Sequence, residues 1–507
     1  MDLGSNSFHL LVADAHPDGQ IDPVVREKEM LRLGDVVSQY GSIPPTAADQ
    51  AVATIRRFRL LSEAAGADEI HARATSAIRR ADNGGELVDR IEDETGVIVE
   101  VISGLEEARL IFGAVRAAVV LDPSPAVCFD LGGGSLEVMV GDASELMWAT
   151  SVPLGVARLS TELVHSDPLS KSDRRALRTR ITDVLAPIVR HTQQFEPKLA
   201  VGSSGTLENL AAMVATRRDE DAPASLNQLT IGREEFLSLH KELLESRAAD
   251  RLRLDGLDTR RVDLIIAGSM FLATAMELFD FDRLTISEWA LREGIVLDAA
   301  GRHDPADWSG DPRAIRRESV LNLCRRCNWP EPHSRHVATL ALQLFEQTEA
   351  LHHLGPEDRE LLEFAALLHD IGEHVASSGH TRHSAYLVRN GQLRGFGPQE
   401  IEMLAAVVRW HRGGDPRVGD DFPLLDSRAM HRVRVLAALL RVADGLDRGR
   451  NQVVYGIDTM VTPSLLLLRV RAVDDIELEV WGARRKRGLL EKVLDREVEL
   501  TSHPSVL

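Results

Sequence analysis

Cysteine, long apolar runs and positive charge are all scarce in this chain of 507 residues. Its three cysteines, Cys128, Cys324 and Cys327, are too few to build a disulfide framework, which indicates a reducing compartment, and we expect the cytoplasm. No apolar run approaches the roughly 20 residues of a membrane-spanning helix, so no membrane association is expected. No basic segment followed by an apolar one opens the chain, so no secretory signal peptide is expected.

The deficit of positive charge limits the classes of partner. There are 59 Lys and Arg residues against 78 Asp and Glu residues, and the formal net charge is −19. This balance argues against non-specific binding to nucleic acid, and we expect no nucleic-acid partner. A small anionic substrate stays compatible with it if Arg, Lys, backbone N–H groups or a metal ion neutralise that substrate locally.

Composition and hydrophobic periodicity indicate a folded, mixed protein. Hydrophobic residues make up 44% of the chain and charged residues 27%, which is typical of globular domains. Strand-like and helix-like patterns alternate through about the first 300 residues, which indicates an α/β fold. The predicted strands cover 8–14, 20–25, 29–33, 69–74, 98–102, two stretches within 126–140, and one from 199. The predicted helices cover 46–66, 83–95, 105–118, 159–165, 170–194, 233–247, 258–279 and 287–299.

The pattern changes after residue 300. The polar segment GRHDPADWSGDP, residues 301–312, predicts a linker, and residues 313–451 have helical spacing almost throughout. The last fifty or so residues predict strands at 465–473 and 476–481, a short helix at 489–494 and a final strand at 498–500. We therefore predict four parts, with the boundaries 1–120, 121–300, 312–457 and 458–507.

One short element occurs twice, as MDLGSNSFHL at the start of the chain and as FDLGGGSLEV from Phe129. Its two copies share six residues at matching positions, and a duplicated half-domain explains this better than chance. The identical pairs are Asp2/Asp130, Leu3/Leu131, Gly4/Gly132, Ser7/Ser135, Val12/Val140 and Asp14/Asp142.

Each copy has the chemistry of a phosphate-binding turn. Glycine lets the backbone approach a ligand closely, successive backbone N–H groups form a concave anion site, and a neighbouring Asp can hold a hard divalent cation. Two ordinary hairpin turns are the alternative, but two matched copies favour a clamp that grips a phosphate chain from both sides. The candidate phosphate ligands in the turns are Gly4, Ser5, Asn6, Ser7, Gly132, Gly133 and Ser135.

Several stretches together resemble one family, the exopolyphosphatase/guanosine pentaphosphate phosphohydrolases of the actin-like ATPase superfamily. They are DLGSNSFHLLVAD, ATSAIRRADN, ISGLEEARLIFGAV, FDLGGGSLEVMVG, VGSSGTLENLA and SEWALREGIVLD. The resemblance implies two ribonuclease-H-like actin-fold domains that present their phosphate loops to a shared cleft. After these it implies an all-α HD-like domain and a small α+β C-terminal segment.

The resemblance also places the catalytic glutamate in the motif ISGLEEARL. By its position directly before Ala-Arg we assign it to Glu107, which would orient or deprotonate the attacking water. Glu106 is the alternative, and a solvated helix start is the competing structural explanation for the pair. The positive end of the helix dipole is expected to lower the pKa of such a carboxylate. Asp130 would hold Mg²⁺ or assist the water, with Asp2 opposite it.

Further candidates lie outside the two turns. Arg79, in ATSAIRR, is a candidate bidentate phosphate ligand, and Arg32 is a weaker one, although either could be an ordinary surface charge. Gly205 and Thr206 begin a predicted helix, which suits either an anion site or a simple helix cap.

A second constellation, rich in histidine, lies in the helical part. The stretches EPHSRHVATLAL, AALLHDIGEH, GHTRHSAYL, VVRWHR and RVADGLDR resemble an HD domain, a helical metal-dependent phosphohydrolase fold. Imidazole and carboxylate ligands together suit Mn, Fe or Zn. His336 is the alternative to His333 as the first ligand, and His380 is a further histidine of the set. The ligands that the resemblance implies are His333, His369, Asp370, His383, His411 and Asp444.

Cys324 and Cys327 lack the second pair of a zinc site, so we expect them to pack within a helix.

These features predict an exopolyphosphatase that removes terminal phosphate from inorganic polyphosphate with Mg²⁺ or Mn²⁺, in a homodimer. Guanosine pentaphosphate 5′-phosphohydrolase is the close alternative, since both reactions break a phosphoanhydride on the same loops. A non-catalytic sensor of polyphosphate or of an alarmone is a different class, which Glu107 and Asp130 disfavour. A kinase of the same superfamily is disfavoured by the family motif at Glu107 and by the HD-like domain. A short strand is expected before Asp2, as Ala126 to Phe129 precede Asp130. We therefore expect that residues added upstream would raise stability or activity.

Overall fold

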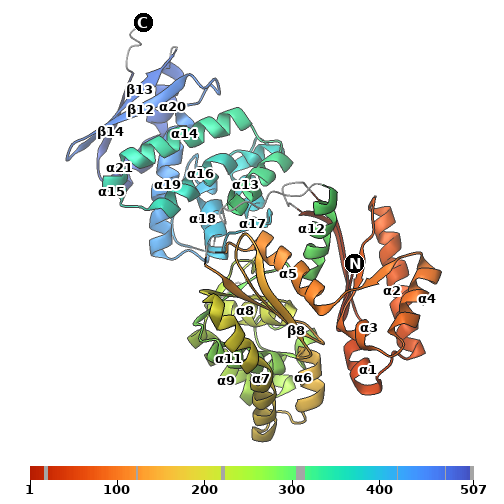
Figure 1. The fold of residues 1–507 in the computed structure, drawn as a ribbon. Coiled ribbons are helices and arrows are strands. Elements are labelled where there is room, and N and C mark those ends of the chain that lie inside the picture. Colours follow the sequence, from red (N-terminus) through yellow and green to blue (C-terminus); the bar gives the residue numbers. More distant parts are fainter. Residues whose placement is uncertain are drawn as a thin grey trace. The chain divides into compact units, whose positions relative to one another are not determined.

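The computed structural model describes residues 1–15, 21–121, 124–218, 223–303, 314–419, 421–473 and 476–502. Two compact units divide the chain, Met1–Ile315 and Arg316–Leu507, and Figure 1 colours both along the sequence. No helix in the described ranges is long and apolar enough to cross a membrane.

The first half of unit 1 is built on a five-stranded sheet with the order β3-β2-β1-β4-β5. β2 is antiparallel to both of its neighbours, whereas β1, β4 and β5 run parallel. The elements of this half are β1 (Asp2–Leu3), β2 (Ser7–Ala15), β3 (Ile21–Met30), α1 (Leu33–Tyr40), α2 (Pro45–Ala64), β4 (Ala72–Ala74), α3 (Ser76–Arg80), α4 (Gly84–Thr95), β5 (Val99–Val101) and α5 (Gly104–Ala118).

The second half of unit 1 is built on a six-stranded sheet with the order β10-β11-β9-β6-β7-β8. Its helices, from α6 to α12, are coloured gold to green in Figure 1. Its elements are β6 (Ala126–Leu131), β7 (Leu136–Gly141), β8 (Leu146–Val152), α6 (Val156–Leu163), α7 (Lys171–Thr192), η1 (Gln193–Phe195), β9 (Leu199–Ser203), α8 (Gly205–Arg218), β10 (Thr230–Gly232), α9 (Arg233–Glu245), α10 (Ala248–Arg251), η2 (Thr259–Arg261), α11 (Ile265–Leu278), β11 (Arg283–Ile286) and α12 (Leu291–His303).

The two sheets repeat one topology. Strands β8-β7-β6-β9-β11 follow the order of β3-β2-β1-β4-β5, and the direction of each pairing agrees: β6 is antiparallel to β7 and parallel to β9, as β1 is to β2 and β4. Because β1 and β6 correspond, Asp2 and Asp130 occupy equivalent positions near the ends of the two central strands. The duplication predicted from the repeated turns thus extends over five strands of each sheet, and β10 is an additional strand of the second sheet.

Two helices connect the halves of unit 1. The apolar face of α5 (Ala108, Ile111 and Val115) packs with Cys128 and Met139 of the second sheet in one buried cluster. α12 packs against α5 and also against β2 and β3 of the first sheet. Figure 1 shows α5 and α12 side by side. The helix that ends the first half of the chain therefore packs on the sheet of the second half.

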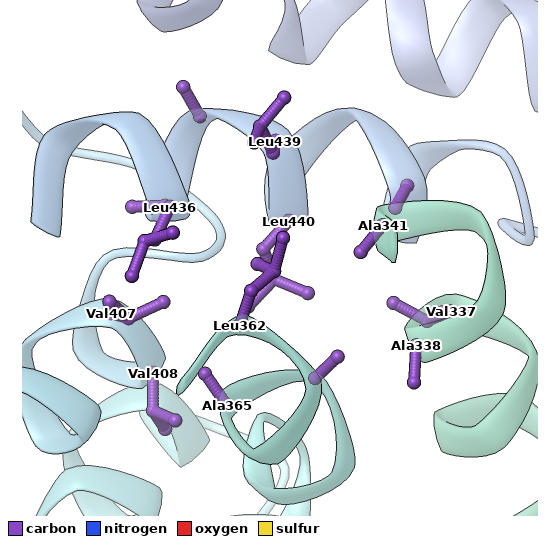
Figure 2. Packing of buried hydrophobic residues seen from close by; sticks show 14 of the residues in the cluster. Val337, Ala338, Ala341, Leu362, Ala365, Val407, Val408, Leu436, Leu439 and Leu440 are labelled. Atoms are coloured by element: carbon purple, nitrogen blue, oxygen red, sulfur yellow. The ribbon is translucent and has the colours of Figure 1, made fainter. Parts of the chain in front are cut away.

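Unit 2 is a helical layer followed by a small sheet with the order β12-β13-β14. Its core is one continuous cluster, and Figure 2 shows Val337, Leu362, Val408 and Leu440 meeting from four different helices. Its elements are α13 (Ala314–Arg326), α14 (Glu331–Gln347), α15 (Glu349–His352), α16 (Pro356–Leu368), η3 (Ile371–His374), α17 (His380–Asn390), α18 (Pro398–Arg409), α19 (Ser427–Gly445), β12 (Val454–Val461), β13 (Leu465–Ala472), α20 (Glu477–Lys486), α21 (Gly488–Leu494) and β14 (Glu497–Ser502).

The strand predicted at 476–481 is wrong, because the chain there forms α20. The letters IELEV alternate as a strand does, yet the buried residues are Ile476, Val480 and Ala483, which have the spacing of a helical face. Leu478, which the strand would have buried, is half exposed.

Three other expectations differ from the structure or lie partly outside the described residues. The separate strand at 29–33 is wrong, because β3 runs without a break to Met30 and Leu33 begins α1. β12 was not predicted, and it spans the boundary drawn between residues 457 and 458. α12 continues to His303, and the rest of the predicted linker lies outside the described residues.

Candidate active site and histidine cluster

The two repeated turns face each other in unit 1. A Cβ atom built on Gly133 would lie 3.1 Å from Cβ of Asn6, and one built on Gly134 would lie 2.7 Å from Oγ of Ser5. A side chain at either position would collide with the opposite turn. The glycines of the second turn are therefore needed because the first turn approaches so closely.

Each turn is held from behind by the start of a helix. In the first turn, the carbonyl oxygens of Ser5 and Asn6 accept hydrogen bonds from the N–H groups of Gly34 and Arg32, next to the start of α1, at 2.7 and 2.9 Å. In the second turn, Gly132 and Gly133 accept from Val156 and Ala157 of α6 at 2.9 and 3.0 Å. The duplication therefore includes the way in which each turn is fixed.

A cavity of about 240 Å³ lies between the turns. Carboxylates, hydroxyl groups, turn backbone and cationic side chains line it, and so does the N-terminus of α8, whose free N–H groups suit an anion. All the predicted turn ligands lie in its wall, with Gly205 and Thr206. The lining residues used below are Asp2, His9, Lys28, Glu107, Asp130, Ser204, Arg261 and Arg292.

Glu107 lies in the wall of this cavity, on the first turn of α5. It is 6% exposed, and Arg79 Nη1 donates to its Oε2 at 3.2 Å. Burial raises the pKa of Glu107 to about 8, with help from Asp2, while Arg79 opposes the shift. The lowered pKa expected for this residue is wrong, because desolvation outweighs the helix N-terminus and the arginine together.

Glu106 lies in a different environment. Its side chain is 39% exposed and pairs with Arg109 at 2.7 Å. That hydrogen bond lowers the pKa of Glu106. Of the two glutamates that the sequence left open, only Glu107 lines the cavity.

Asp2 and Asp130 both line the cavity. Burial raises the pKa of Asp2 to about 7, with Arg292 opposing, and it raises the pKa of Asp130 to about 6, with the Ser203 hydroxyl opposing from 2.6 Å. Oδ1 of Asp2 is buried and accepts no hydrogen bond from the described residues. An unsatisfied carboxylate oxygen beside other acids is the environment that a divalent cation would relieve.

Two further acids were not predicted, Glu208, which lines the cavity, and Glu137, which interacts with Glu107 and Asp130 from β7. Glu137 is the more deeply buried of the two. It is 1% exposed on β7, and Ser151 donates to its Oε1 at 2.7 Å. Burial and the neighbouring Glu107 and Asp130 raise its pKa well above the ordinary value. The signal was present in the sequence, since Glu137 is the charged residue within the otherwise apolar strand LEVMVG.

A group of cations in the cavity wall was also missed. Lys28, Arg261 and Arg292 all line it, and the proximity of Arg261 contributes to lowering the pKa of Lys28 to about 8, after burial as the main cause. Arg292 Nη1 lies 3.2 Å from Nδ1 of His9, whose pKa burial lowers strongly, so His9 is neutral there. These residues come from β3, η2 and α12, so no local motif could have collected them.

The predicted arginines have other positions. Arg79 contacts Glu107 and donates to the carbonyl of Ile102 at 2.6 Å, and it is not among the residues that line the cavity. Arg32 supports the first turn through its backbone, while its side chain lines a different cavity. Ser204 precedes α8 with a φ of 82°, a strained conformation of the kind that often occurs at functional sites.

The histidine constellation of unit 2 forms one buried cluster around Asp370. Two groups of close ligand atoms share this residue, His333 and His369 with Asp370, and His380 and His411 with Asp370. Nε2 of His333 and of His369 lie 3.8 and 3.6 Å from Oδ2 of Asp370. Nε2 of His380 and of His411 each lie 3.5 Å from its Oδ1. Asp444 also faces the cluster, with its Oδ1 3.6 Å from His333 Nε2.

The four imidazoles are oriented with one nitrogen fixed and the other directed inward. Nδ1 of His369, His380 and His411 contacts a backbone carbonyl oxygen at 2.6 to 2.9 Å. Nδ1 of His333 lies 2.7 Å from Oδ2 of Asp447, which the sequence did not single out. All four Nε2 atoms are buried and have no hydrogen-bond partner within the described part of the chain. This arrangement is typical of metal-binding histidines.

The cluster differs from the predicted ligand set in one histidine, and it contains His333 and not the alternative His336. His380 belongs to it, whereas His383 is half-buried and belongs to neither group of ligand atoms. His336, the alternative to His333, also lies outside both groups. Burial alone would raise the pKa of Asp370, but the imidazoles of His369 and His411 hold it below its ordinary value.

The sequence model of the Ppx/GppA phosphatase family matches residues 11–303, more than half of the chain. The chain belongs to this family. The model of Ppx/GppA phosphatase domain III matches residues 315–483. The helical second unit therefore matches a domain described for the same family.

Named relatives and a solved structure agree with this assignment. Exopolyphosphatase 1 of Mycobacterium leprae is 34% identical over 299 residues, which are 59% of this chain and 87% of that protein. Exopolyphosphatase 1 of Mycobacterium tuberculosis strain H37Rv is 33% identical over 340 residues, 67% of this chain and 96% of that protein. The crystal structure of an exopolyphosphatase from Cytophaga hutchinsonii matches with 31% identity and a TM-score of 0.55, covering 59% of this chain and 96% of that one. The predicted family and fold class are confirmed.

Proposed function

We propose that this protein is an exopolyphosphatase, which hydrolyses the terminal phosphate of inorganic polyphosphate. The observation that carries the proposal is the pair of facing turns, with the buried Glu107 and Asp130 and the partly buried Asp2 in the wall of the cavity between them. The relatives that bear the name exopolyphosphatase support the same substrate.

A divalent cation, Mg²⁺ or Mn²⁺, is part of this proposal. Asp2 and Asp130 would hold it, because Asp130 is buried and the buried Oδ1 of Asp2 lacks a partner within the described part of the chain. When bound, the cation supplies positive charge that neutralises the phosphate oxygens.

The residues of the chain then have distinct roles. Glu107 accepts a proton from the attacking water, and its raised pKa makes it a stronger base once it is ionised. Oxygen of that water bonds to the terminal phosphorus while the anhydride P–O bond breaks, and the shortened polyphosphate leaves with its bonding electrons. Arg79 holds the carboxylate of Glu107 in position, and the turns together with α8 bind the phosphoryl oxygens.

The cations at the cavity wall favour a substrate with several phosphates in a row. Lys28, Arg261 and Arg292 lie beside the turns, where they would bind the phosphates that follow the terminal one. Guanosine pentaphosphate also carries a phosphate chain, so it remains the alternative substrate.

One comparison of substrates tests the proposal. Phosphate release is measured from long-chain polyphosphate and from guanosine pentaphosphate at equal enzyme concentration, with Mg²⁺ and with Mn²⁺. A higher kcat/KM for polyphosphate is expected, whereas a higher value for guanosine pentaphosphate would identify the alternative enzyme. Tight binding of either compound without phosphate release would make the protein a sensor.

For unit 2 we propose an HD-like metal centre that takes a transition metal ion. The observation in its favour is the set of four inward-directed Nε2 atoms around Asp370, which is the donor chemistry of Mn, Fe or Zn. Elemental analysis of the purified full chain should find such a metal at about one or two ions per chain after dialysis against the metal. Dialysed protein with no bound metal would contradict the proposal.

We further propose that the protein acts in the cytoplasm as a homodimer, as the family resemblance implies. Its cysteines, all buried and unpaired in the described structure, are consistent with a reducing compartment. Light scattering of the full chain at micromolar concentration tests the dimer, and a mass equal to 55.8 kDa would contradict it.

A further inference from the structure

The side chain of His9 connects one cation of the cleft in unit 1 to the first repeated turn. Its Nδ1 lies 3.2 Å from Nη1 of Arg292, and its Nε2 lies 2.7 Å from Oγ of Ser7. Ser7 and His9 are two residues apart on β2, so their side chains project from the same face of the strand. All three residues line the cavity between the turns, and the imidazole therefore has a neighbour from the cavity wall at each of its nitrogens.

The guanidinium of Arg292 decides which imidazole nitrogen carries the hydrogen. Its N–H groups only donate hydrogen bonds, so Nδ1 of His9 must accept in the contact between them. A protonated ring would direct one N–H group at another across this distance, so the ring is neutral. The single hydrogen of a neutral imidazole then lies on Nε2, where it faces Ser7.

This hydrogen fixes what the hydroxyl group of Ser7 can do. Because Oγ of Ser7 accepts a hydrogen bond from Nε2 of His9, its own hydrogen is turned away from the ring and is available to another acceptor. Ser7 is 7% exposed in the wall of the cavity, where an oxygen of a bound phosphate would be that acceptor. Three donors thus follow one another, from the guanidinium through the imidazole to the hydroxyl group.

The second turn has the opposite arrangement at the equivalent positions. With the offset of 128 residues between the repeats, Ser7 corresponds to Ser135 and His9 corresponds to Glu137. A carboxylate oxygen accepts hydrogen bonds, and Ser135 donates one to Glu137. The hydrogen of Ser135 is therefore used within the wall, and its oxygen lone pairs are left for the cavity. One serine is a donor toward the cavity and the other an acceptor.

We propose that His9 is a positioning residue of the cleft, which keeps the hydroxyl group of Ser7 oriented as a hydrogen-bond donor to the phosphoryl group that is transferred. Ser135 is then left to accept a hydrogen bond from a donor such as the attacking water. The two turns, alike in sequence, thus have different tasks. This inference rests on the hydrolysis proposed for the cleft, and its test includes a measurement that does not depend on activity.

Two substitutions of His9 separate the roles of its nitrogens. Gln places its amide near the position of Nε2 and can still donate to Ser7, whereas Asn reaches only the position of Nδ1 and cannot. His9→Asn should lower kcat for polyphosphate about tenfold or more, as loss of a charge-assisted hydrogen bond implies, and His9→Gln should lose much less. KM should change little in either variant, because Lys28, Arg261 and Arg292 would hold the other phosphates.

The effect of His9→Asn should pass through Ser7. Ser7→Ala alone should lower kcat by a similar factor, and adding His9→Asn to it should have little further effect, because the two residues act as a unit. His240→Asn is the matched control. Nδ1 of His240 also lies beside a serine of unit 1, 3.2 Å from Oγ of Ser269, but His240 does not line the cavity, so its substitution should leave kcat unchanged.

The position of the hydrogen can be observed without any turnover. Nitrogen-15 spectra of the full chain with labelled histidine distinguish a neutral ring that carries hydrogen on Nε2 from one that carries it on Nδ1. The signals that are missing in His9→Gln identify those of His9 among the 18 histidines. We expect the hydrogen on Nε2, both with and without added inorganic phosphate.

The outcomes that would overturn the inference differ from those that would overturn the proposed function. A hydrogen on Nδ1 of His9, or a charged ring, would overturn the inference even if the protein hydrolyses polyphosphate. Equal losses of kcat in His9→Asn and His9→Gln, or additive losses from His9→Asn and Ser7→Ala, would show that His9 only supports the fold. Absence of phosphate release by wild type, with the hydrogen on Nε2, would overturn the proposed function and the positioning role with it.

Discussion

The cleft of unit 1 and the histidine cluster of unit 2 place buried carboxylates in opposite electrostatic environments. In the cleft, three acids line the same cavity, and burial raises the pKa of each of them: Asp2, Glu107 and Asp130. In the cluster, imidazoles, Arg450 and Lys486 surround Asp370 and Asp444, whose pKa values are lowered. The cations that line the cleft, Lys28, Arg261 and Arg292, thus do not outweigh the burial of its acids, whereas the cluster pairs its carboxylates with its own cations. Under the proposed function the cleft would take up a cation from solution, whereas the cluster offers the nitrogen donors that suit a transition metal.

The largest effect should follow from removing the base of the cleft. Glu107→Gln is expected to lower kcat for polyphosphate by about 10²- to 10⁴-fold, the usual contribution of a general base. Glu106→Gln is the matched control and should stay within about twofold of wild type, because Glu106 is exposed and pairs with Arg109. Equal losses in the two variants, measured as phosphate release, would remove Glu107 from its assigned role.

The next effect separates two histidines of one helix. His380→Ala should weaken metal binding to unit 2 by about 10- to 100-fold, whereas His383→Ala should leave it unchanged, because only His380 directs Nε2 at Asp370. Titration of metal-free protein with Zn²⁺ provides the measurement. The reverse result would restore the ligand set predicted from the sequence.

A smaller effect concerns the contact between the two turns. Gly134→Ala should lower kcat about tenfold, because its Cβ would lie 2.7 and 2.9 Å from the hydroxyl groups of Ser5 and Ser76 and would push the turns apart. Gly113→Ala, on α5 with no atom within 4 Å of the new Cβ, is the control, and it should stabilise the protein by about 0.5–1 kcal/mol without loss of activity. Full activity of Gly134→Ala would show that the close approach of the turns is not required.

The smallest effect is on stability as a function of pH, and it has opposite signs in the two units. The raised pKa values of Asp2 and Asp130, about 7 and about 6, mean that these groups destabilise unit 1 as the pH rises above about 4, most fully above 7. The lowered pKa values of Asp370 and Asp444 stabilise unit 2 above about pH 4, and this contribution is lost only as the pH falls further. Between pH 5 and 8, melting of metal-free unit 1 should shift downward by a few degrees.

Calorimetry with and without Mg²⁺ measures that shift. Added Mg²⁺ should reduce the loss in unit 1, because a bound cation favours the ionised aspartates. A melting temperature of unit 1 that rises between pH 5 and 8 without metal would contradict the electrostatic contrast between the two centres.

Local patterns in the sequence predicted much of the fold. The repeated DLG elements predicted the duplication. In each copy, the six shared residues marked two strands and the turn between them, which lies at the cleft. Helices with a clear apolar face, such as α2 and α5, were predicted to within a few residues. The wrong prediction at α20 arose because the five residues IELEV fit both the alternation of a strand and the periodicity of a helix. The packing of Val480 and Ala483 against the core favours the helix.

The site was predicted only where its residues share a motif. Glu107 and the turn residues lie in short contiguous stretches, so the sequence could single them out. Lys28, Arg261 and Arg292 meet only because β3, η2 and α12 converge, and no stretch of sequence contains two of them. The pKa of Glu107 was predicted with the wrong sign because the sequence indicated the helix start but not the depth of burial.

The packing of α5 and α12 sets the order in which the chain can fold as it is synthesised. α5 leaves the ribosome with an apolar face before the sheet on which that face packs has been synthesised. β2 and β3 pack against α12, which is synthesised nearly three hundred residues after the first strand. The nascent first half therefore exposes apolar surface until the second half emerges. Translation speed across residues 119–303, and access of chaperones to the unfinished chain, should consequently matter more for the yield of folded protein than the intrinsic stability of either sheet.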